Sequence, residues 1–517
     1  MKEKAILLVC VLVAILCPAA IGKVIYVDDD AAGANDGTSW EDAYIYLQEA
    51  LADANSAEKP VEIRVAQGIY KPDMGAGQTA GDRNASFILT SGLILTGGYA
   101  GILEPDPNER NYEKYQTFLS GDLVGNDIDV NNPYELLYEP TREDNSYHVI
   151  TAFWPDSASL LDGFKILAGF AGGRISVGGG GGIRMDYGKF QICNCSFINN
   201  FGTEGAGICV NYGQLNLINC VFKTNAAQNG GGIYNSNSEI KLVNCYFENN
   251  IANSIGGGIY SEDSKINIEN SIFIDNSASD GGAIYLHKCL KDSSFNNSLL
   301  VGNSAMNNGG AISMDQNEEA MEIKNFTFTG NSAIRGKAVF FTFCELKINN
   351  SILYNGGQDE IGIWNNRYRR IVVCYSNIQN GQAGIYDPQV KLVWGEGNID
   401  TDPLFADPNN GDYHLKSQAG RYDSISQSQS CTASGAGWVI DSNTSPCIDA
   451  GDPNSPIGIE PFPNGGYINM GAYGGTAEAS KSYFGQPVCE TIIAGDINGD
   501  CKVDFKDFAI LSDHWLK

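Results

Sequence analysis

The sequence predicts an all-β fold, a parallel β-helix built from stacked short strands, and two repeated phrases carry this prediction. The first phrase is a glycine-rich turn followed by an aliphatic residue, found at Ile183, Ile208, Ile233, Ile259, Ile284, Ile312 and Val339. The second phrase, F-x-x-N, pairs Phe197 with Asn200, Phe222 with Asn225, Phe247 with Asn250, Phe273 with Asn276 and Phe328 with Asn331, and Leu300 with Asn303 is a variant. The aliphatic positions are 25 to 28 residues apart, and a fixed period in this range indicates a solenoid.

One period shows why the repeat predicts strands and turns. The stretch LNLINCVF, residues 215–222, alternates apolar and polar residues as a half-buried strand does. Asn225 tolerates the left-handed conformation that a turn needs, and Gly230, Gly231 and Gly232 supply backbone freedom. Ile233 and Tyr234 then begin another strand. We therefore expect two or three short strands in each repeat.

Stacked rungs place equivalent residues above one another, about 4.8 Å apart. Asparagines in two columns are then predicted to form amide ladders at the turns. One column is Asn200, Asn225, Asn250, Asn276, Asn303 and Asn331, and the other is Asn194, Asn219, Asn244, Asn270, Asn325 and Asn350. A ligand-binding role for some of these side chains is the alternative interpretation.

Composition and charge exclude several functions. The net charge is −28, which argues against binding nucleic acid or an anionic membrane surface, and the carboxylates suit solubility or calcium binding. Residues 1–22 have two lysines, an apolar run and small residues before Lys23, as in a secretory signal peptide. No later apolar stretch in the mature chain is long enough to span a membrane. We predict a secreted or cell-surface protein.

Cysteine positions lead to three predictions. Cys195, Cys220 and Cys245 share one column of adjacent rungs and are expected to form a buried, reduced stack, with an inter-rung disulfide as the alternative. Cys489 and Cys501 are expected to form a disulfide in an exported protein, and Cys431 with Cys447 is a further candidate pair.

The chain divides into a β-helix at 23–480, a linker at 481–487 and a small module at 488–517. Within the β-helix we expect an N-terminal cap at 23–60, a polar insertion at 103–145, regular rungs at 178–378 and a C-terminal cap at 379–480. The cap contains a predicted helix over 40–54, with Ala43, Leu47, Ala50, Leu51 and Ala54 on one face, covering the open first rung. The segments 445–453 and 468–475 are predicted to be terminal cap strands.

The C-terminal module contains a pattern of oxygen ligands with the spacing of an EF-hand calcium loop. Asp496, Asn498, Asp500, Asp504 and Asp507 occupy loop positions one, three, five, nine and twelve, and Lys502 would offer its carbonyl at position seven. Position six is Cys501 where glycine is usual, and position twelve is Asp rather than Glu. A helix over 508–516 is expected to follow. The sequence therefore predicts a Ca²⁺ site.

This module, with Asp507 at position twelve, resembles a dockerin repeat. Dockerins usually carry two such repeats, and one is present in this sequence. The resemblance implies calcium binding and a cohesin-like or other cell-surface partner.

The repeats themselves resemble two groups of β-helix proteins. The pairing of GG[AG]I with F-x-x-N over 178–355 resembles the repeats of chlamydial polymorphic outer-membrane proteins, although no membrane barrel follows in this chain. The stretches 24–44, 63–72, 402–415, 445–453 and 468–475 resemble secreted right-handed parallel β-helix proteins of planctomycete type, with a pectin-lyase-like fold. This resemblance implies fold and location rather than an activity.

Two functions are weighed from these features. One is an exported calcium-binding protein with a cell-surface, adhesive or carbohydrate-associated role, for which a polysaccharide is a possible ligand. The other is a polysaccharide lyase or glycoside hydrolase, which would need clustered carboxylates beside an Arg or Lys on an outer face. Asp186, Glu204, Glu239, Glu262, Asp263 and Asp280 are candidate groove residues, and no catalytic residue is assigned. Tyr187, Tyr212, Tyr234, Tyr260 and Tyr285 are a candidate aromatic column, either packed between rungs or open to sugar rings.

Overall fold

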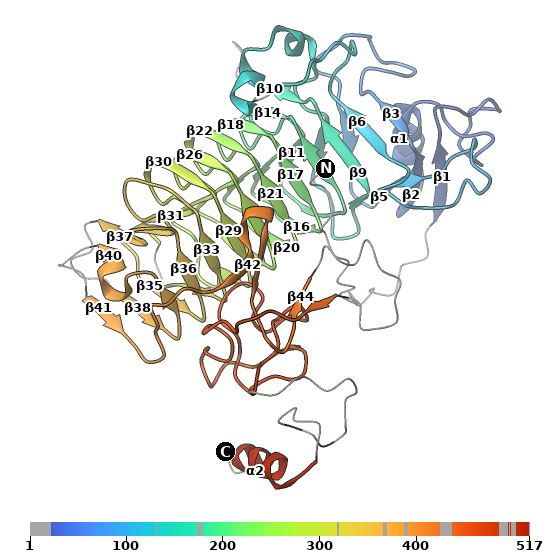
Figure 1. Cartoon of the computed structure of the whole chain (residues 1–517). Helices are drawn as coiled ribbons and strands as arrows, with labels where there is room; N and C mark the ends of the chain where they lie inside the picture. The colour runs from blue at the N-terminus through green and yellow to red at the C-terminus, as the bar shows by residue number, and fades with distance from the viewer. Residues whose placement is uncertain are drawn as a thin grey trace.

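The protein is a right-handed parallel β-helix, which confirms the predicted fold class (Figure 1). The computed structural model describes residues 22–130, 132–172, 178–317, 320–364, 370–386, 391–423, 437–484, 495, 497 and 503–515. The predicted signal peptide, except Gly22, and the predicted Cys489–Cys501 disulfide lie outside these residues. Among the described residues, no helix is both long and apolar enough to cross a membrane.

Four parallel sheets, named A to D, run along the stack. Sheet A contains β1 (Lys23–Val27), β2 (Val61–Ala66), β5 (Leu93–Tyr99), β8 (Leu160–Asp162), β12 (Lys189–Cys193), β16 (Gln214–Ile218), β20 (Glu239–Val243), β24 (Lys265–Glu269), β28 (Ser294–Asn296), β32 (Met321–Lys324), β35 (Leu346–Asn349), β38 (Arg370–Cys374) and β41 (Lys391–Trp394). Sheet B contains β3 (Gly68–Tyr70), β6 (Thr117–Ser120), β9 (Phe164–Leu167), β13 (Ser196–Ile198), β17 (Val221–Lys223), β21 (Tyr246–Glu248), β25 (Ile272–Ile274), β29 (Leu299–Val301), β33 (Thr327–Thr329), β36 (Ile352–Tyr354) and β39 (Asn377–Ile378).

Sheets C and D complete the regular rungs. Sheet C contains β4 (Phe87–Leu89), β7 (Ile150–Phe153), β11 (Ile183–Asp186), β15 (Ile208–Asn211), β19 (Ile233–Ser236), β23 (Ile259–Glu262), β27 (Ile284–His287), β31 (Ile312–Asp315), β34 (Val339–Thr342), β37 (Ile361–Trp364) and β40 (Ile385–Tyr386). Sheet D contains β10 (Phe170–Ala171), β14 (Phe201–Glu204), β18 (Ala226–Asn229), β22 (Ile251–Ile255), β26 (Ser277–Asp280) and β30 (Ser304–Asn308). The chain passes through C, A, B and D in turn, so a regular rung has four strands where two or three were expected.

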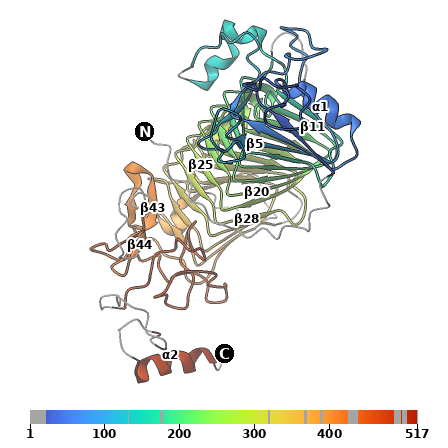
Figure 2. The ribbon, with the colours of Figure 1, turned by 90° about the vertical axis from the view of Figure 1, so that its right-hand side faces the viewer.

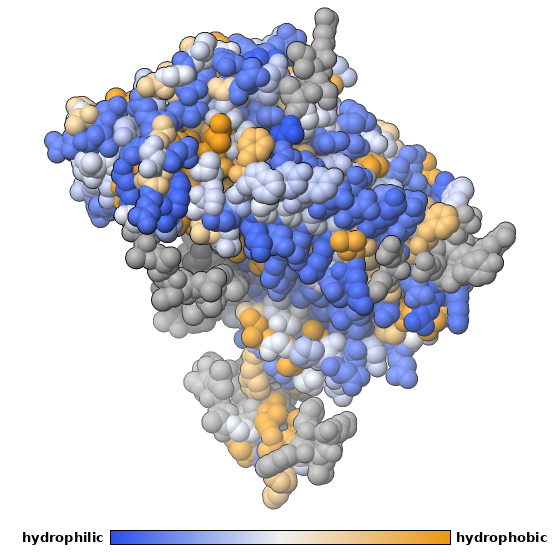
Figure 3. Space-filling model, turned by 180° about the vertical axis from the view of Figure 1, so that it is seen from behind, coloured by the Kyte–Doolittle hydropathy of each residue, from blue (hydrophilic) through white to orange (hydrophobic). Residues whose placement is uncertain are grey.

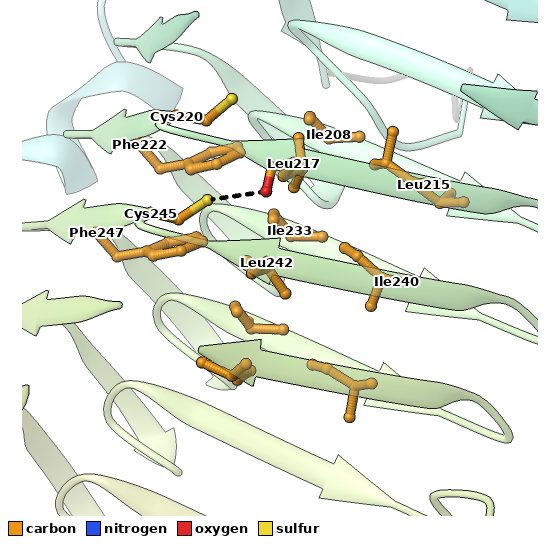
Figure 4. Close-up of a cluster of buried hydrophobic side chains, with 14 of the residues drawn as sticks. Ile208, Leu215, Leu217, Cys220, Phe222, Ile233, Ile240, Leu242, Cys245 and Phe247 are labelled. Atoms are coloured by element: carbon orange, nitrogen blue, oxygen red, sulfur yellow. Dashed lines mark hydrogen bonds between the residues drawn. The ribbon is translucent and has the colours of Figure 1, made fainter. Parts of the chain in front are cut away.

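The repeated residues stack in register, as predicted. Ile233 pairs with Ile208 on one side and with Ile259 on the other. Phe197, Phe222, Phe247 and Phe273 form a continuous inner stack, with ring centroids 4.6–4.7 Å apart and planes within 8° of parallel. Figure 4 shows this interior, with apolar side chains of successive rungs directly above one another. One apolar core therefore runs along the solenoid, seen from its end in Figure 2.

The cysteine column is a stack of free thiols. Cys195, Cys220 and Cys245 are buried and reduced, and the Cys245 thiol lies 3.6 Å from the carbonyl oxygen of Leu217. Burial raises the pKa of each of the Cys195 and Cys220 thiols far above its usual range, so they act as small apolar groups. Cys447 is also a free, buried thiol, and its predicted pairing with Cys431 is therefore wrong.

The first asparagine ladder forms as predicted and runs further than expected. Each Nδ2 donates to the Oδ1 of the next rung, at 2.8–3.1 Å from Asn200 through Asn331, and the ladder continues into Asn355. Asn355 then donates through both its backbone nitrogen and its Nδ2 to the carboxylate of Glu360, at 2.9 and 2.5 Å. Since every amide points the same way, the ladder ends on an acceptor with two oxygens.

Glu360 makes stability depend on pH. Its side chain is buried, and this burial raises its pKa from 4.5 to about 7. The folded protein thus retains a proton that the unfolded chain has lost, and stability should fall as pH rises from about 4.5 to about 7, by roughly 3 kcal/mol. Melting temperatures of the wild type and Glu360→Gln at pH 5 and pH 8 test this. Glu460 and Asp127, whose pKa values are also raised, remain in both proteins, so the loss of slope in the variant isolates Glu360. An equal slope in both proteins would contradict the assignment.

The second asparagine column forms hydrogen bonds in the opposite direction. Asn244 donates to Asn219 at 3.2 Å, Asn219 donates to Asn194 at 3.1 Å, and Asn194 donates to Asp162 at 2.7 Å. Asp162 in turn pairs with Arg110 at 2.9 Å. Each ladder therefore ends on a carboxylate, at opposite ends of the stack. All six predicted members have a positive φ, which explains the choice of asparagine at this turn.

The first rung is capped by a helix, as expected, although the helix is shorter than predicted. Helix α1 (Leu47–Ser56) buries Leu47, Ala50, Leu51 and Ala54. Residues 40–46 are not helical because Tyr44 pairs with Val27 as an additional bridge of the sheet. Ala43 is buried next to the helix rather than within it.

The polar insertion predicted over 103–145 is interrupted by β6 (Thr117–Ser120), which belongs to sheet B. Its second part, residues 121–145, covers the N-terminal rungs of sheet D. It contains two short 3₁₀ helices, η1 (Pro133–Leu137) and η2 (Pro140–Asp144). Leu136 of η1 packs with Phe170, Phe201 and Ala226 of sheet D. Figure 1 shows these two helices projecting from the N-terminal half of the solenoid.

The residues that follow β41, 395–423 and 437–484, are called the C-terminal segment. This segment folds back along the outer side of sheet B, a contact that the sequence does not predict. Residues 445–453 and 468–475 form irregular turns, so the predicted cap strands are wrong there. The regular elements described there are two short antiparallel pairs, β42 (Phe405–Asp407) with β43 (Asp412–Leu415) and β44 (Arg421–Tyr422) with β45 (Trp438–Val439), and the 3₁₀ helix η4 (Pro408–Asn410). The 3₁₀ helix η3 (Gly381–Gly384) lies in the last rungs, before this segment. Tyr413, Leu415 and Met470 pack on Leu299 and Ile352 from the outer side of sheet B. Asn297, Asn325 and Asn350 form hydrogen bonds with backbone atoms of the C-terminal segment.

Candidate functional site on the outer face of sheet C

The three long sheets present different outer faces. Sheet A is a solvated surface on which charged side chains of neighbouring rungs pair, as Lys265 does with Glu239 at 2.9 Å. Sheet B is covered over β25 to β36 by the returning C-terminal segment. The third long sheet is sheet C, and the side chains on its outer face are polar or aromatic. We therefore consider sheet C as the candidate functional surface.

The sheet C face is defined by the second and fourth residues of each strand from β11 to β31. Those residues are Arg184, Asp186, Cys209, Asn211, Tyr234, Ser236, Tyr260, Glu262, Tyr285, His287, Ser313 and Asp315. The alternate residues, Ile183 and Met185 among them, point into the core. Sheet D lies next in the rung and contributes Glu204 from β14.

Arg184, Asp186 and Glu204 come together at the N-terminal end of this face. Arg184 pairs with Asp186 at 2.9 Å, and Asn211 donates to the other oxygen of Asp186 at 3.0 Å. All three charged groups act on the buried Cys209 thiol, whose pKa is raised to about 12 chiefly by burial. Burial also raises the pKa of Glu204, and repulsion from Glu262 adds to this. Glu204 is therefore more readily protonated than an ordinary glutamate.

Glu262 lies further along the face and is held by hydroxyl groups. Tyr234 donates to it at 3.2 Å, Tyr260 donates to its other oxygen, and Ser236 donates at 3.4 Å. Tyr234 interacts electrostatically with both Glu204 and Glu262, so this buried phenol lies near both carboxyl groups.

The five predicted tyrosines separate into two columns. Tyr234, Tyr260 and Tyr285 lie on the strands and pack edge to face, with centroids 5.3 and 5.7 Å apart, so they are packed between rungs. Tyr187 and Tyr212 lie instead at the turn between sheets C and A, where Trp154 precedes them. The rings of Trp154, Tyr187 and Tyr212 stack at 4.5 and 5.4 Å and are 66%, 41% and 58% exposed. We call these three residues the aromatic ridge.

The aromatic ridge borders the polar column of the sheet C face. Tyr187 follows Asp186 directly, and Tyr212 follows Asn211. In the N-terminal rung Phe153, 47% exposed, pairs in register with Asp186, and it precedes Trp154. Figure 3 shows how exposed apolar groups occur in isolated patches on a largely hydrophilic surface. Exposed rings beside hydrogen-bonding side chains are the combination that a polar, ring-containing ligand needs.

The other predicted groove residues lie elsewhere. Glu239 belongs to sheet A and pairs with Lys265, while Asp263 is a turn residue with a positive φ. Asp280 lies on sheet D and accepts from Asn308 at 2.7 Å. His287 of the sheet C face pairs with Asp315 at 3.2 Å, and His414 is buried against Asp412 in the C-terminal segment.

The sheet C acids do not converge on a single point. Within the described part of the chain, the one group of three acidic side chains whose oxygens all lie within 4.8 Å of each other is Asp28, Asp29 and Asp30. Asp28 is buried and accepts from the backbone nitrogens of Asp30 and Ile102. These bonds explain the acidic run as a turn that fixes the N-terminal cap.

The predicted calcium loop is described in part. Asp496, Asn498 and Asp500 lie outside the described residues. Asp507 is 2% exposed, and its carboxylate accepts from the backbone nitrogens of Ile497 and Asp504 at 2.7 and 2.8 Å. Helix α2 (Phe505–Trp515) begins three residues earlier than predicted and exposes Phe508 and Leu511.

Comparisons with known proteins give two family matches, each over less than half of the chain. A model described as disaggregatase related matches residues 314–451. A repeat of the Chlamydia polymorphic membrane protein matches residues 244–262 and 270–287, which confirms the resemblance of the repeats. No curated protein matches the chain.

A solved structure is also similar. The crystal structure of pectate lyase Pel9A aligns over 88% of this chain and 96% of its own, with 13% identity and a TM-score of 0.43. The fold assignment rests on the strand pairing described above.

Proposed function

We propose that the protein is an exported β-helix protein with a carbohydrate-associated binding role, and that the sheet C face with the aromatic ridge binds the carbohydrate. One observation carries this proposal: exposed, stacked rings run beside a column of hydrogen-bonding side chains that repeats once per rung. A column with a repeat of about 4.8 Å suits an extended, regularly repeating polymer. The match to a membrane-protein repeat supports a location at the cell surface.

The C-terminal module is proposed to bind Ca²⁺ through Asp496, Asn498, Asp500, Asp504 and Asp507. The buried carboxylate of Asp507 supports this proposal, because two backbone nitrogens hold it in place at the twelfth position of the loop. A cohesin-like or other cell-surface partner of this dockerin-like module remains part of the proposal, as does export through the 1–22 signal peptide.

Removing rings of the aromatic ridge should weaken carbohydrate binding. Trp154→Ala and Tyr212→Ala are each expected to lower affinity about five- to tenfold for polysaccharides that the wild type binds, since each removes a stacking surface worth about 1 kcal/mol. Affinity electrophoresis against a polysaccharide panel measures this. Tyr138→Ala removes a ring that is 78% exposed in the insertion and should leave affinity unchanged. Equal losses in all three variants, or none, would overturn the assignment of the surface.

A hydrolytic function is the second candidate, and one observation favours it. Glu204, with its raised pKa, and Asp186, paired with Arg184, lie in one neighbourhood of the sheet C face. Two neighbouring carboxyl groups, one of them with a raised pKa, are the arrangement that glycoside hydrolysis uses. Cleavage of any bound polysaccharide by the wild type, abolished in Glu204→Gln, would replace binding with hydrolysis as the function.

A further inference from the structure

The polar insertion contains a second cluster of oxygen atoms, distant in sequence from the C-terminal loop. Asn126 and Asp127 lie beside Asp144 and Asn145 in two hydrogen-bonded pairs. Asn126 donates to one oxygen of Asp144 at 2.9 Å, and Asn145 donates to one oxygen of Asp127 at 2.9 Å. The hydrogen bonds therefore join residues 126–127, in the middle of the insertion, to residues 144–145 at its C-terminal end.

Three oxygens in this cluster are buried without a hydrogen-bond donor. They are Oδ1 of Asp127, Oδ1 of Asp144 and Oδ1 of Asn145. Asn145 is fully buried, and its amide faces Asp127 through the bond just described. A buried acceptor left without a donor costs about 1–3 kcal/mol, so a bound cation or a further donor would stabilise each of these oxygens.

The local charge identifies the kind of partner. Asp122, Asp127, Asp129, Glu139 and Asp144 surround Arg142, which pairs with the Oδ2 of Asp127 at 3.2 Å. Arg83 is the other arginine at the cluster, and its Nε donates to the backbone carbonyl of Asn145 at 2.7 Å. Acidic side chains outnumber the arginines at the cluster, so a further positive charge would stabilise it.

We propose that Asp127, Asp144 and Asn145 form a Ca²⁺ site that fastens the insertion to the β-helix. Carboxylate and amide oxygens without histidine or cysteine are the ligands of a hard cation, and an irregular loop suits the flexible geometry of Ca²⁺ better than the strict octahedron of Mg²⁺. Asp122 holds the loop in place by accepting from the backbone nitrogens of Gly125, Asn126 and Asp127.

The position of the site explains what the ion would stabilise. Asn145 also donates to the carbonyl of Ala168, and Arg142 donates to the carbonyl of Asn199, both at turns that lead into sheet D. The cluster thus lies where the insertion meets two successive rungs. The ion would join Asp127 to residues 144–145, across a stretch of the insertion that buries few apolar side chains of its own.

Calcium titration of the full chain tests the proposal, with the C-terminal loop inactivated by Asp504→Asn and Asp507→Asn. Isothermal titration calorimetry with Ca²⁺ alone should detect one ion, with an affinity of roughly 10⁻⁴–10⁻³ M as in extracellular modules. Adding Asp144→Asn, which keeps the shape of the side chain, should weaken this binding at least tenfold. Glu113→Gln, which removes an exposed charge from the same insertion, should leave it unchanged.

Limited proteolysis gives an independent readout. Ca²⁺ should slow cleavage within residues 121–145 of the loop-inactivated protein and should not do so in the Asp144→Asn variant. Absence of Ca²⁺ binding up to about 10 mM in the loop-inactivated protein, or binding that Asp144→Asn does not alter, would overturn the proposal. In the first case ordered water would be the partner of the three oxygens.

Discussion

Replacing Asn276 by leucine is expected to lower the free energy of unfolding by about 3–5 kcal/mol. Its Oδ1 accepts from the backbone nitrogen and the Nδ2 of Asn250, at 3.0 and 2.9 Å. Its Nδ2 donates to the carbonyl of Phe247 and to Asn303, both at 3.0 Å. Leucine has a similar size and forms none of these bonds, so four buried groups would lose a partner, each at about 1–3 kcal/mol before relaxation.

Denaturant unfolding of the full chain measures this effect, and hydrogen exchange of the rungs on either side localises it. Asn253→Leu is the matched control, because Asn253 is an exposed asparagine of the adjacent rung in sheet D. A loss below about 1 kcal/mol for Asn276→Leu would show that the ladder contributes little.

The direction of the ladder gives a second test at the same position. Asn276→Asp keeps the acceptor for Asn250 but turns an oxygen towards Asn303 and Phe247, where a donor is required. This variant should therefore also destabilise the protein, and most strongly at a pH where the carboxylate is ionised. Equal stability at pH 4 and pH 8 would contradict the assigned direction.

Substituting alanine for Gly256 is expected to cost about 2–4 kcal/mol. This position opens the glycine phrase and is glycine in all seven rungs, each with a positive φ between 56° and 85°. A Cβ at any of these glycines would lie 2.1–2.4 Å from the carbonyl oxygen three residues later. The substitution would therefore combine backbone strain with a clash against the backbone.

Gly258→Ala is the internal control for this prediction. It lies two residues later in the same phrase, and Ala283, Ala311 and Ala338 occupy its position in following rungs. Gly258 has no positive φ, and a Cβ there would lie 2.8 Å from the carbonyl oxygen of Ala283, a milder clash than at Gly256. We therefore expect the free energy of unfolding to fall by about 1 kcal/mol, less than for Gly256→Ala. Thermal unfolding of the two variants side by side checks the difference, and comparable losses would show that the turn conformation is not what selects glycine.

The repeat period predicts which asparagines stack in a ladder, but it does not predict the residue at which the ladder ends. Asn355 continues the ladder only 24 residues after Asn331, and Glu360 follows it within the same turn, so neither fits the F-x-x-N phrase. Their roles depend on the direction of the amides, which is a property of the folded stack. A buried carboxylate that accepts two bonds has no local sequence pattern.

The covering of sheet B and the separation of the tyrosines into two columns could have been predicted from the sequence. The outward residues of sheet B change from Lys223 and Glu248 to Ile272, Ile274 and Leu299, which indicates that a covering segment begins there. Tyr187 and Tyr212 follow their aliphatic residues by four positions, whereas Tyr234 follows Ile233 by one. This offset already separates an exposed turn column from a packed strand column.

The grouping of Arg184, Asp186 and Glu204 could not be predicted in the same way. Glu204 belongs to a strand of sheet D that the sequence analysis did not separate from its neighbours. Its raised pKa depends on burial and on Glu262, two rungs away. Such contacts between columns depend on side-chain directions at the corner of sheets C and D.

Hydrogen–deuterium exchange of the full chain, with and without a polysaccharide that it binds, tests the functional account most directly. Bound polymer should slow exchange in β7, β11, β15, β19 and β23 of sheet C and at the turns that carry the aromatic ridge. Exchange in the sheet A strands of the same rungs should be unchanged. Protection confined to sheet A or to the C-terminal segment over sheet B, with sheet C unaffected, would contradict the proposal that the sheet C face is the binding surface.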